Sequence, residues 1–139
     1  MKLKAMKESL DLVIVKAEYG EGKRAGWLSS FTVACLDEDG TLLEIGKVST
    51  GLKEKDEEGT SFKIITDMLK PLIISEKGKE VVVKPSVIIE VGYEELQRSP
   101  SYSSGYALRF PRFLKLREDK SLSGITSIGY IDQLYREQK

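Results

Sequence analysis

Histidine is absent from this chain of 139 residues, and cysteine occurs only once. The lack of histidine removes the usual metal ligand and the usual general base at neutral pH. The lone Cys35 excludes an internal disulfide, and its neighbours Val33, Ala34 and Leu36 predict a small buried side chain rather than a reactive thiol. We therefore expect no metal site in this chain.

Net charge is also lacking, because 22 lysines and arginines balance 22 aspartates and glutamates. Any binding to nucleic acid must then come from local basic patches rather than from the field of the whole molecule. The sequence holds no signal peptide and no apolar run long enough to span a bilayer, so we expect a cytoplasmic protein without a membrane partner. With 40% hydrophobic and 32% charged residues, the chain suits one globular domain with a modest core.

Residues that favour β-structure recur at strand spacing in the first third of the chain. Strands are predicted over residues 10–17, 30–36 and 42–48. Leu10, Leu12 and Ile14 would share one face of the first strand. Asp39-Gly40 predicts the turn of a hairpin between the second and third strands.

A helix is predicted next, because apolar residues recur at helical spacing from Phe62 to Leu72, after the candidate caps Thr60 and Ser61. Further strands are predicted over residues 81–83, 87–91 and 106–116, with a break at Pro85. A second, short helix would follow near the end of the chain. A helix between the third and fourth strands is typical of an OB-fold.

We therefore expect an all-β domain: a five-stranded Greek-key OB-fold barrel with a helix between strands 3 and 4 and a short C-terminal helix. The same periodicity also fits an SH3-like barrel or an α+β sandwich. Residues 1–9 have no packing pattern of their own, whereas strand material begins at Leu10. The domain is accordingly expected to cover residues 10–139, with residues 1–9 as a linker or the end of a preceding domain.

The stretch RFPRFLKLREDK, residues 109–120, is the most unusual in the chain. Its basic residues are Arg109, Arg112, Lys115, Arg117 and Lys120. Strand alternation puts Arg109 and Phe113 on one face and the apolar Phe110 and Leu114 on the other, while Pro111 implies an edge or a bulge. A cationic face with an aromatic ring suits a phosphate backbone, although a solvated amphipathic strand has the same pattern.

A glycine-rich loop, YGEGKRAGW at residues 19–27, is a second candidate for anion binding. Gly20, Gly22 and Gly26 would let backbone amides approach an anion, with Lys23 and Arg24 at the tip. The loop lacks the Gly-Lys-Ser/Thr ending of a P-loop, so it is not predicted to be a nucleotide site.

Four segments, in this order, resemble the C-terminal OB-fold domain of ATP-dependent DNA ligases, most closely the archaeal and eukaryotic replicative type. They are LDLVIVKAEYGEGKRAG, IGKVSTGL, VVVKPSVIIEVGYEELQRSP and RFPRFLKLREDK. The resemblance covers essentially the whole chain. Its most specific element, RFPRFLKLREDK, is similar to the family's terminal nucleotidyltransferase motif. The lysines of KLK, Lys2 and Lys4, resemble the motif that closes the preceding nucleotidyltransferase domain.

The resemblance implies a ligase that forms phosphodiester bonds during DNA replication, repair and recombination. In this family a lysine of a Lys-x-Asp-Gly motif is adenylylated by ATP with Mg²⁺. AMP then passes to the 5′-phosphate of a nick, and the 3′-hydroxyl displaces it. The OB-fold domain would bring its Arg-x-Asp-Lys motif to the triphosphate in a closed state, and would lie in the minor groove opposite the nick in an open state.

Site residues are implied by the same resemblance. Arg117, Asp119 and Lys120 would orient the pyrophosphate leaving group, and the nucleotide would also contact Lys2, Lys4 and Arg112. DNA would be held by Lys23, Arg24, Lys84, Arg109, Phe110 and Phe113. Either Phe110 or Phe113 would press into the minor groove.

The sequence departs from the family in having no Lys-x-Asp-Gly motif. We therefore expect this chain to be inactive alone and to bind neither ATP nor Mg²⁺ tightly, as an excised domain or a truncated gene product. The expected partners are nicked duplex DNA and the ligase's own nucleotidyltransferase domain. A sliding clamp, bound through the full protein, is a further candidate.

Two other functions fit parts of the sequence. A stand-alone OB-fold module would bind single strands without chemistry, using exposed aromatics such as Trp27, Tyr93 and Tyr102. It would not account for the Arg-x-Asp-Lys ending. The OB-fold domain of a capping enzyme or RNA ligase would share that ending, but the RFPRF run and the GEGKRAG loop favour DNA ligase.

The predicted terminal helix has two interpretations. It would run from a cap at Thr126 or Ser127 to Tyr135. Its apolar stripe, Ile128, Ile131 and Leu134, would either pack on the domain's own core or dock on the adenylylation domain in the closed state.

Overall fold

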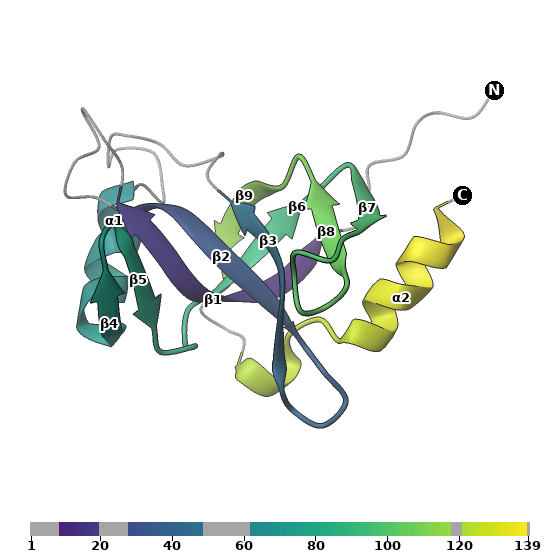
Figure 1. The fold of residues 1–139 in the computed structure, drawn as a ribbon, viewed down its shortest axis with the longest axis horizontal. Helices are drawn as coiled ribbons and strands as arrows, with labels where there is room; N and C mark the ends of the chain where they lie inside the picture. Colours follow the sequence, from purple (N-terminus) through teal and green to yellow (C-terminus); the bar gives the residue numbers. More distant parts are fainter. Residues whose placement is uncertain (1–8, 20–27, 49–61, 118–120, 139) are drawn as a thin grey trace.

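A computed structural model describes residues 9–19, 28–48, 62–117 and 121–138 of the chain (Figure 1). The strands are β1 (Leu10–Tyr19), β2 (Leu28–Leu36), β3 (Leu42–Val48), β4 (Ile73–Lys77), β5 (Glu80–Val83), β6 (Ile88–Gly92), β7 (Glu95–Arg98), β8 (Tyr106–Arg109) and β9 (Arg112–Leu116). The helices are α1 (Phe62–Leu69), a 3₁₀ turn (Lys70–Leu72), a second 3₁₀ turn (Leu122–Gly124) and α2 (Ile128–Glu137). No helix in these ranges is long and apolar enough to cross a membrane.

Strand β1 is the centre of a seven-stranded antiparallel sheet. It pairs with β2 from Val13 to Tyr19, with β6 through Leu10–Val13, and with β5 through Lys16–Glu18. The β1–β2 register shifts between Ile14 and Lys16, where β1 changes from one neighbour to the other. Such a bulge bends the strand and lets one sheet curl around a core. Strands β3 and β4 extend the sheet on its two sides, and β9 joins it through β6.

The main core lies on the face of β1 that carries Leu10, Leu12 and Ile14, each at most 1% exposed. This confirms the predicted face of the first strand. A smaller cluster on the other face of β1 and β2 is made by Val13, Ala34, Ile88 and Ile125. The sheet is therefore covered on both faces near its centre.

The helix between β3 and β4 is present as predicted. Its Ile65 and Leu69 are fully buried, and the hydroxyl of Thr66 accepts a hydrogen bond from the backbone N–H of Leu28 at 2.8 Å. The α-helix ends at Leu69, and Pro71 lies in the 3₁₀ turn that follows. The candidate caps Thr60 and Ser61 lie outside the described residues.

Helix α2 packs on the domain's own core, at the opposite end of the molecule from α1 (Figure 1). Ser127 is its cap, since its side chain accepts a hydrogen bond from the N–H of Tyr130. Ile131 is fully buried, and Tyr106 donates a hydrogen bond to Asp132, which raises the pKa of the Tyr106 phenol. The core-packing interpretation of the terminal helix is thus confirmed.

Other local predictions are confirmed as well. Gly40 has φ 91° in the turn between β2 and β3, a conformation that glycine adopts without strain. The break at Pro85 separates β5 from β6. Cys35 is fully buried, and this burial raises the pKa of its thiol to about 12, so the thiol stays protonated and unreactive.

The predicted strand over residues 106–116 is wrong in one respect, because it is two strands. β8 ends at Arg109 and pairs with β7, whereas β9 begins at Arg112 and pairs with β6. Phe110, between them, has φ 53°. This break reverses the predicted faces: Phe113 is 5% exposed and belongs to the core, while Leu114 is 49% exposed. The short strands β4 and β7 were not predicted either.

Candidate functional site

The basic stretch RFPRFLKLREDK is described from residue 109 to residue 117. The two ends of this described part have different surroundings. Arg109 and Phe110 lie at the corner where β8 meets β9, and Arg117 follows the last residue of β9. At about 3.3 Å per strand residue, these ends are on the order of 20 Å apart. A single segment of chain therefore carries two separate candidate contact points.

At the first end, Phe110 combines backbone strain with an exposed ring. A phenylalanine with positive φ costs about 1–2 kcal/mol relative to an ordinary backbone conformation. The ring is nevertheless 60% exposed, so burial does not offset that cost. The Arg109 guanidinium lies over the ring, 5.1 Å from its centroid, and also pairs with Glu95 at 3.6 Å. Strain without burial points to a functional role for this corner.

Phe113 does not share that role. Because its ring is buried in the main core, Phe113 cannot press into a DNA groove without unfolding the domain. Of the two phenylalanines predicted to contact DNA, Phe110 is the one whose ring is accessible. Arg112 is exposed, at the start of β9 opposite Gly92 of β6.

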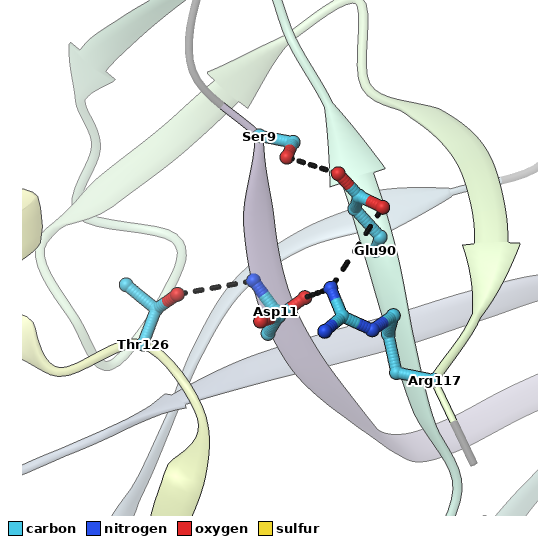
Figure 2. A network of polar contacts seen from close by, with 5 residues as sticks. All are labelled: Ser9, Asp11, Glu90, Arg117 and Thr126. Atoms are coloured by element: carbon cyan, nitrogen blue, oxygen red, sulfur yellow. Dashed lines mark hydrogen bonds and ion pairs between the residues drawn. The ribbon is translucent and has the colours of Figure 1, made fainter. Parts of the chain in front are cut away.

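At the second end, Arg117 lies in a half-buried network (Figure 2). Its Nη1 donates to Oδ1 of Asp11 at 3.0 Å and lies 3.9 Å from Oε1 of Glu90. The three side chains are between 19% and 22% exposed. Ser9 donates a hydrogen bond to Glu90 from the other side. A hydrogen bond to a charged group in such surroundings contributes about 1.5–3 kcal/mol.

The two carboxylates of this network stand directly opposite each other. Asp11 of β1 and Glu90 of β6 are register partners in the antiparallel ladder. Like charges in that position destabilise a sheet unless a cation lies between them. Arg117 supplies the cation, and its own backbone is fixed by an N–H bond to the carbonyl of Ile88 at 2.8 Å.

Thr126 connects Asp11 to the segment that leads into α2. The backbone N–H of Asp11 donates to Oγ1 of Thr126 at 3.0 Å, and the Thr126 N–H donates to the carbonyl of Asp11 at 2.9 Å. The Thr126 carbonyl in turn accepts from Leu36 of β2. Asp11 is therefore held rigidly while its carboxylate holds Arg117 (Figure 2).

An open pocket of about 340 Å³ adjoins Arg117. It is lined by Met68, Leu72, Ser86, Val87, Ile88, Leu116 and Arg117. Lys84 is exposed, and its backbone N–H donates to the carbonyl of Leu72, one of the residues that line the pocket. The predicted contact of Lys84 with DNA stays a prediction.

Six predicted site residues lie outside the part of the chain that the structure describes. They are Lys2, Lys4, Lys23, Arg24, Asp119 and Lys120. Their assignments stay predictions.

Within the described ranges, no group of three or more histidine, cysteine, aspartate or glutamate residues could hold a metal ion. Nor do the exposed aromatic side chains of these described residues form a stacking platform for single strands, and the candidate Trp27 lies outside them. Phe110 and Tyr130 are exposed, but Phe110 lies between β8 and β9 and Tyr130 lies on α2. Tyr93, predicted as an exposed candidate, is 6% exposed and lies in the core.

Asp11 and Glu90 are the site residues that sequence reasoning missed. Each interrupts an apolar strand, Asp11 between Leu10 and Leu12 and Glu90 between Ile89 and Val91. A lone carboxylate in such a run usually marks the solvent face of a strand. Only the register between β1 and β6 reveals that the two face each other.

Comparison with known proteins gives a consistent result. The family model described as the C-terminal region of ATP-dependent DNA ligase matches residues 24–120. The chain is 55% identical over its full length to a DNA ligase of Nanoarchaeum equitans and 50% identical over 99% of its length to one of Archaeoglobus fulgidus. It spans 25% and 24% of those proteins, about a quarter of the length of these relatives.

Two solved structures are similar in fold. The ligase domain from M. tuberculosis LigD has a TM-score of 0.67 and 26% identity, over 86% of this chain and 38% of that chain. A mycobacterial DNA ligase D complexed with ATP and MES has a TM-score of 0.62 and 25% identity, over 86% of this chain and 37% of that one. These likenesses confirm the predicted OB-fold. The chain therefore belongs to the family of C-terminal regions of ATP-dependent DNA ligases.

Proposed function

We propose that this domain serves a DNA ligase in two steps of nick sealing during DNA replication, repair and recombination. It binds nicked duplex DNA through the Arg109–Phe110 corner, and it orients the pyrophosphate of ATP through Arg117, Asp119 and Lys120 while the enzyme is adenylylated. The observation that carries the proposal is the strained and exposed Phe110, at the far end of the segment that leads to Arg117.

The DNA step rests on the chemistry of the corner. An exposed ring flanked by guanidinium groups suits a minor groove, where apolar wedges enter between base steps and arginines contact phosphates. Arg109 stacks on the ring and Arg112 is exposed two residues beyond it. The pair between Arg109 and Glu95 is nearly half exposed on both sides, so exchanging Glu95 for a phosphate costs little.

The nucleotide step rests on charge at the other end. Phosphoryl transfer depends on positive charge placed at the leaving oxygens, and arginine offers a planar fork of donors for them. Arg117 opens the Arg-x-Asp-Lys motif and lines an open pocket. Lys2 and Lys4 are proposed as further nucleotide contacts, and Lys23, Arg24 and Lys84 as DNA contacts. Arg112, predicted as a nucleotide contact, is exposed at the Phe110 end of β9 and is proposed to act in the DNA step.

Lys-x-Asp-Gly and the ligands for Mg²⁺ would belong to another part of the full protein, so the nucleotidyltransferase domain is the proposed partner of this one. A sliding clamp is proposed only as a partner of the whole ligase.

A chimaera tests the proposal. This chain would replace the matching quarter of the N. equitans DNA ligase, to which it is 55% identical. With ATP, Mg²⁺ and a nicked duplex, we expect the chimaera to become adenylylated and to seal nicks within about tenfold of the parent rate. The same ligase lacking the segment should do neither.

Binding assays separate the alternative function. The chimaera should prefer a nicked duplex to a single strand of equal length. A folded chimaera that is inactive and favours the single strand would contradict the proposal and support a stand-alone single-strand binder.

A further inference from the structure

We propose that Asp11 and Glu90 are positioning residues: they form an anionic seat that holds Arg117 away from the nucleotide, so that ATP must compete with two carboxylates of the domain itself for this guanidinium. The inference rests on the proposed function, since it requires that Arg117 serve the triphosphate. It assigns a role to two residues that no motif contains.

The first step of the argument is charge. One guanidinium nitrogen lies 3.0 Å from Asp11 and 3.9 Å from Glu90, so both carboxylates face it (Figure 2). A triphosphate that approached Arg117 in this position would meet the same two negative charges. Repulsion between those carboxylates and the phosphates opposes a shared arrangement. Arg117 must therefore leave the seat to serve the nucleotide.

The second step is rigidity. The seat itself cannot follow Arg117, because Asp11 is bonded to Thr126 through both its backbone N–H and its carbonyl, and Glu90 is bonded to Ser9. The backbone of Arg117 is likewise fixed to Ile88. Movement between the two partners is left to the arginine side chain, which has several rotatable bonds.

The third step is the energetic consequence. When the competent conformer is only a fraction of the population, the apparent affinity for its ligand falls by that fraction. While Arg117 occupies the seat, the domain lacks one of its cations for pyrophosphate. The seat thus raises the ATP concentration needed for half-maximal adenylylation, and weakening the seat should lower it.

The experiment measures single-turnover adenylylation of the chimaera against ATP concentration. Asp11→Asn and Glu90→Gln keep an acceptor oxygen and remove one charge each. We expect the half-saturating ATP concentration to fall about three- to tenfold for Asp11→Asn. A smaller fall is expected for Glu90→Gln, because its oxygen lies farther from Arg117. The maximal rate should not fall.

Two comparisons separate positioning from a merely structural role. Glu44→Gln removes a strand carboxylate paired with Lys16 at 3.2 Å and should leave ATP dependence unchanged. In an Arg117→Ala background, Asp11→Asn should no longer alter the half-saturating ATP concentration, because the residue it holds is gone. Thermal unfolding would verify that each variant is folded.

Each remaining outcome is decisive. Folded Asp11→Asn and Glu90→Gln variants with unchanged or raised half-saturating ATP would overturn the seat. The same shift with and without Arg117 would overturn it too, because the carboxylate would then act independently of the arginine. If the chimaera without substitutions is not adenylylated by ATP, the proposed function is wrong, and this inference falls with it. Failure of the seat alone is different, because that chimaera would still be adenylylated.

Discussion

The two ends of the basic stretch are built in opposite ways. At the corner between β8 and β9, Arg109 is 48% exposed and Phe110 60% exposed, with one loose ion pair to Glu95. At the end of β9, Arg117 is 20% exposed and lies between two carboxylates. The first end is open to a partner from the start. The second is occupied by the domain's own side chains.

This difference follows from what each end pairs with. β8 pairs only with β7, in a separate two-stranded sheet, and the chain leaves it through the exposed Phe110. β9 joins the main sheet through β6, next to β1, which brings Arg117 beside Asp11 of β1. Under the proposed function, the exposed end is ready to contact DNA, whereas the other end serves the nucleotide only after Arg117 leaves its seat. The predictions below test this contrast.

The largest effect is expected from the two phenylalanines on either side of the break. Phe113→Ala should lower the free energy of unfolding by about 3–5 kcal/mol, because a buried ring leaves a cavity. Phe110→Ala should change it by less than about 0.5 kcal/mol, since that ring is largely exposed. Urea denaturation of the 139-residue chain measures both. Equal losses for the two variants would show that the corner is as buried as the strand.

Arg117→Ala is expected to have the next largest effect. Loss of one donor to a transition-state oxyanion typically slows catalysis about 10²–10³-fold, and we expect this range for adenylylation of the chimaera. Sealing of a nick that already carries AMP should be spared, because no pyrophosphate leaves in that step. Quenched-flow assays with labelled ATP and with pre-adenylylated DNA measure the two steps.

A double variant separates the effect of Arg117 on adenylylation from its effect on stability. Removal of Arg117 leaves Asp11 and Glu90 facing each other without the guanidinium, so the domain should also be destabilised. Adding Asp11→Asn should recover stability but not adenylylation. Recovery of both would mean that Arg117 acts only on folding, and the contrast between the two ends would fail.

Local signals explain which parts of the fold could be predicted from sequence. The turn at Gly40, the cap at Ser127 and the break at Pro85 each depend on a few adjacent residues, and each is present. The burial of Cys35 also follows from its immediate apolar neighbours. Such features need no knowledge of which strands pair.

Long-range pairing explains the rest. Asp11 and Glu90 are almost eighty positions apart in sequence and meet only through the β1–β6 register, so no local pattern reveals their seat for Arg117. Strand alternation puts Phe113 on the wrong face, because Phe110 adopts a left-handed backbone that alternation cannot foresee. Because β9, and not β8, pairs with β6, the ring of Phe113 is buried and the ring of Phe110 is not.

A third prediction concerns the ring of Phe110 in DNA binding. Phe110→Ala should weaken binding of the chimaera to a nicked duplex by about 1–2 kcal/mol, roughly tenfold, because contact of an aromatic ring with bases has this magnitude. Fluorescence anisotropy with a nicked duplex measures the loss. Phe110→Gly is the sharper control: it relieves the positive φ and should be at least as stable as the wild type. It should bind DNA no better than Phe110→Ala, and wild-type affinity in either variant would remove Phe110 from the interface.

The smallest effect is expected from the arginine that covers that ring. Arg109→Ala should weaken binding to nicked DNA only a few-fold, and the dependence of log K on log salt should become shallower by about 1, as for loss of one phosphate contact. Glu95→Gln should act in the opposite direction, since it frees Arg109 from its ion pair and removes a negative charge from the corner. Titrations at several salt concentrations distinguish the two. An unchanged salt slope in Arg109→Ala would mean that Arg109 supports the Phe110 ring by stacking and does not reach a phosphate, so that the open end of the stretch would contact DNA through its ring alone.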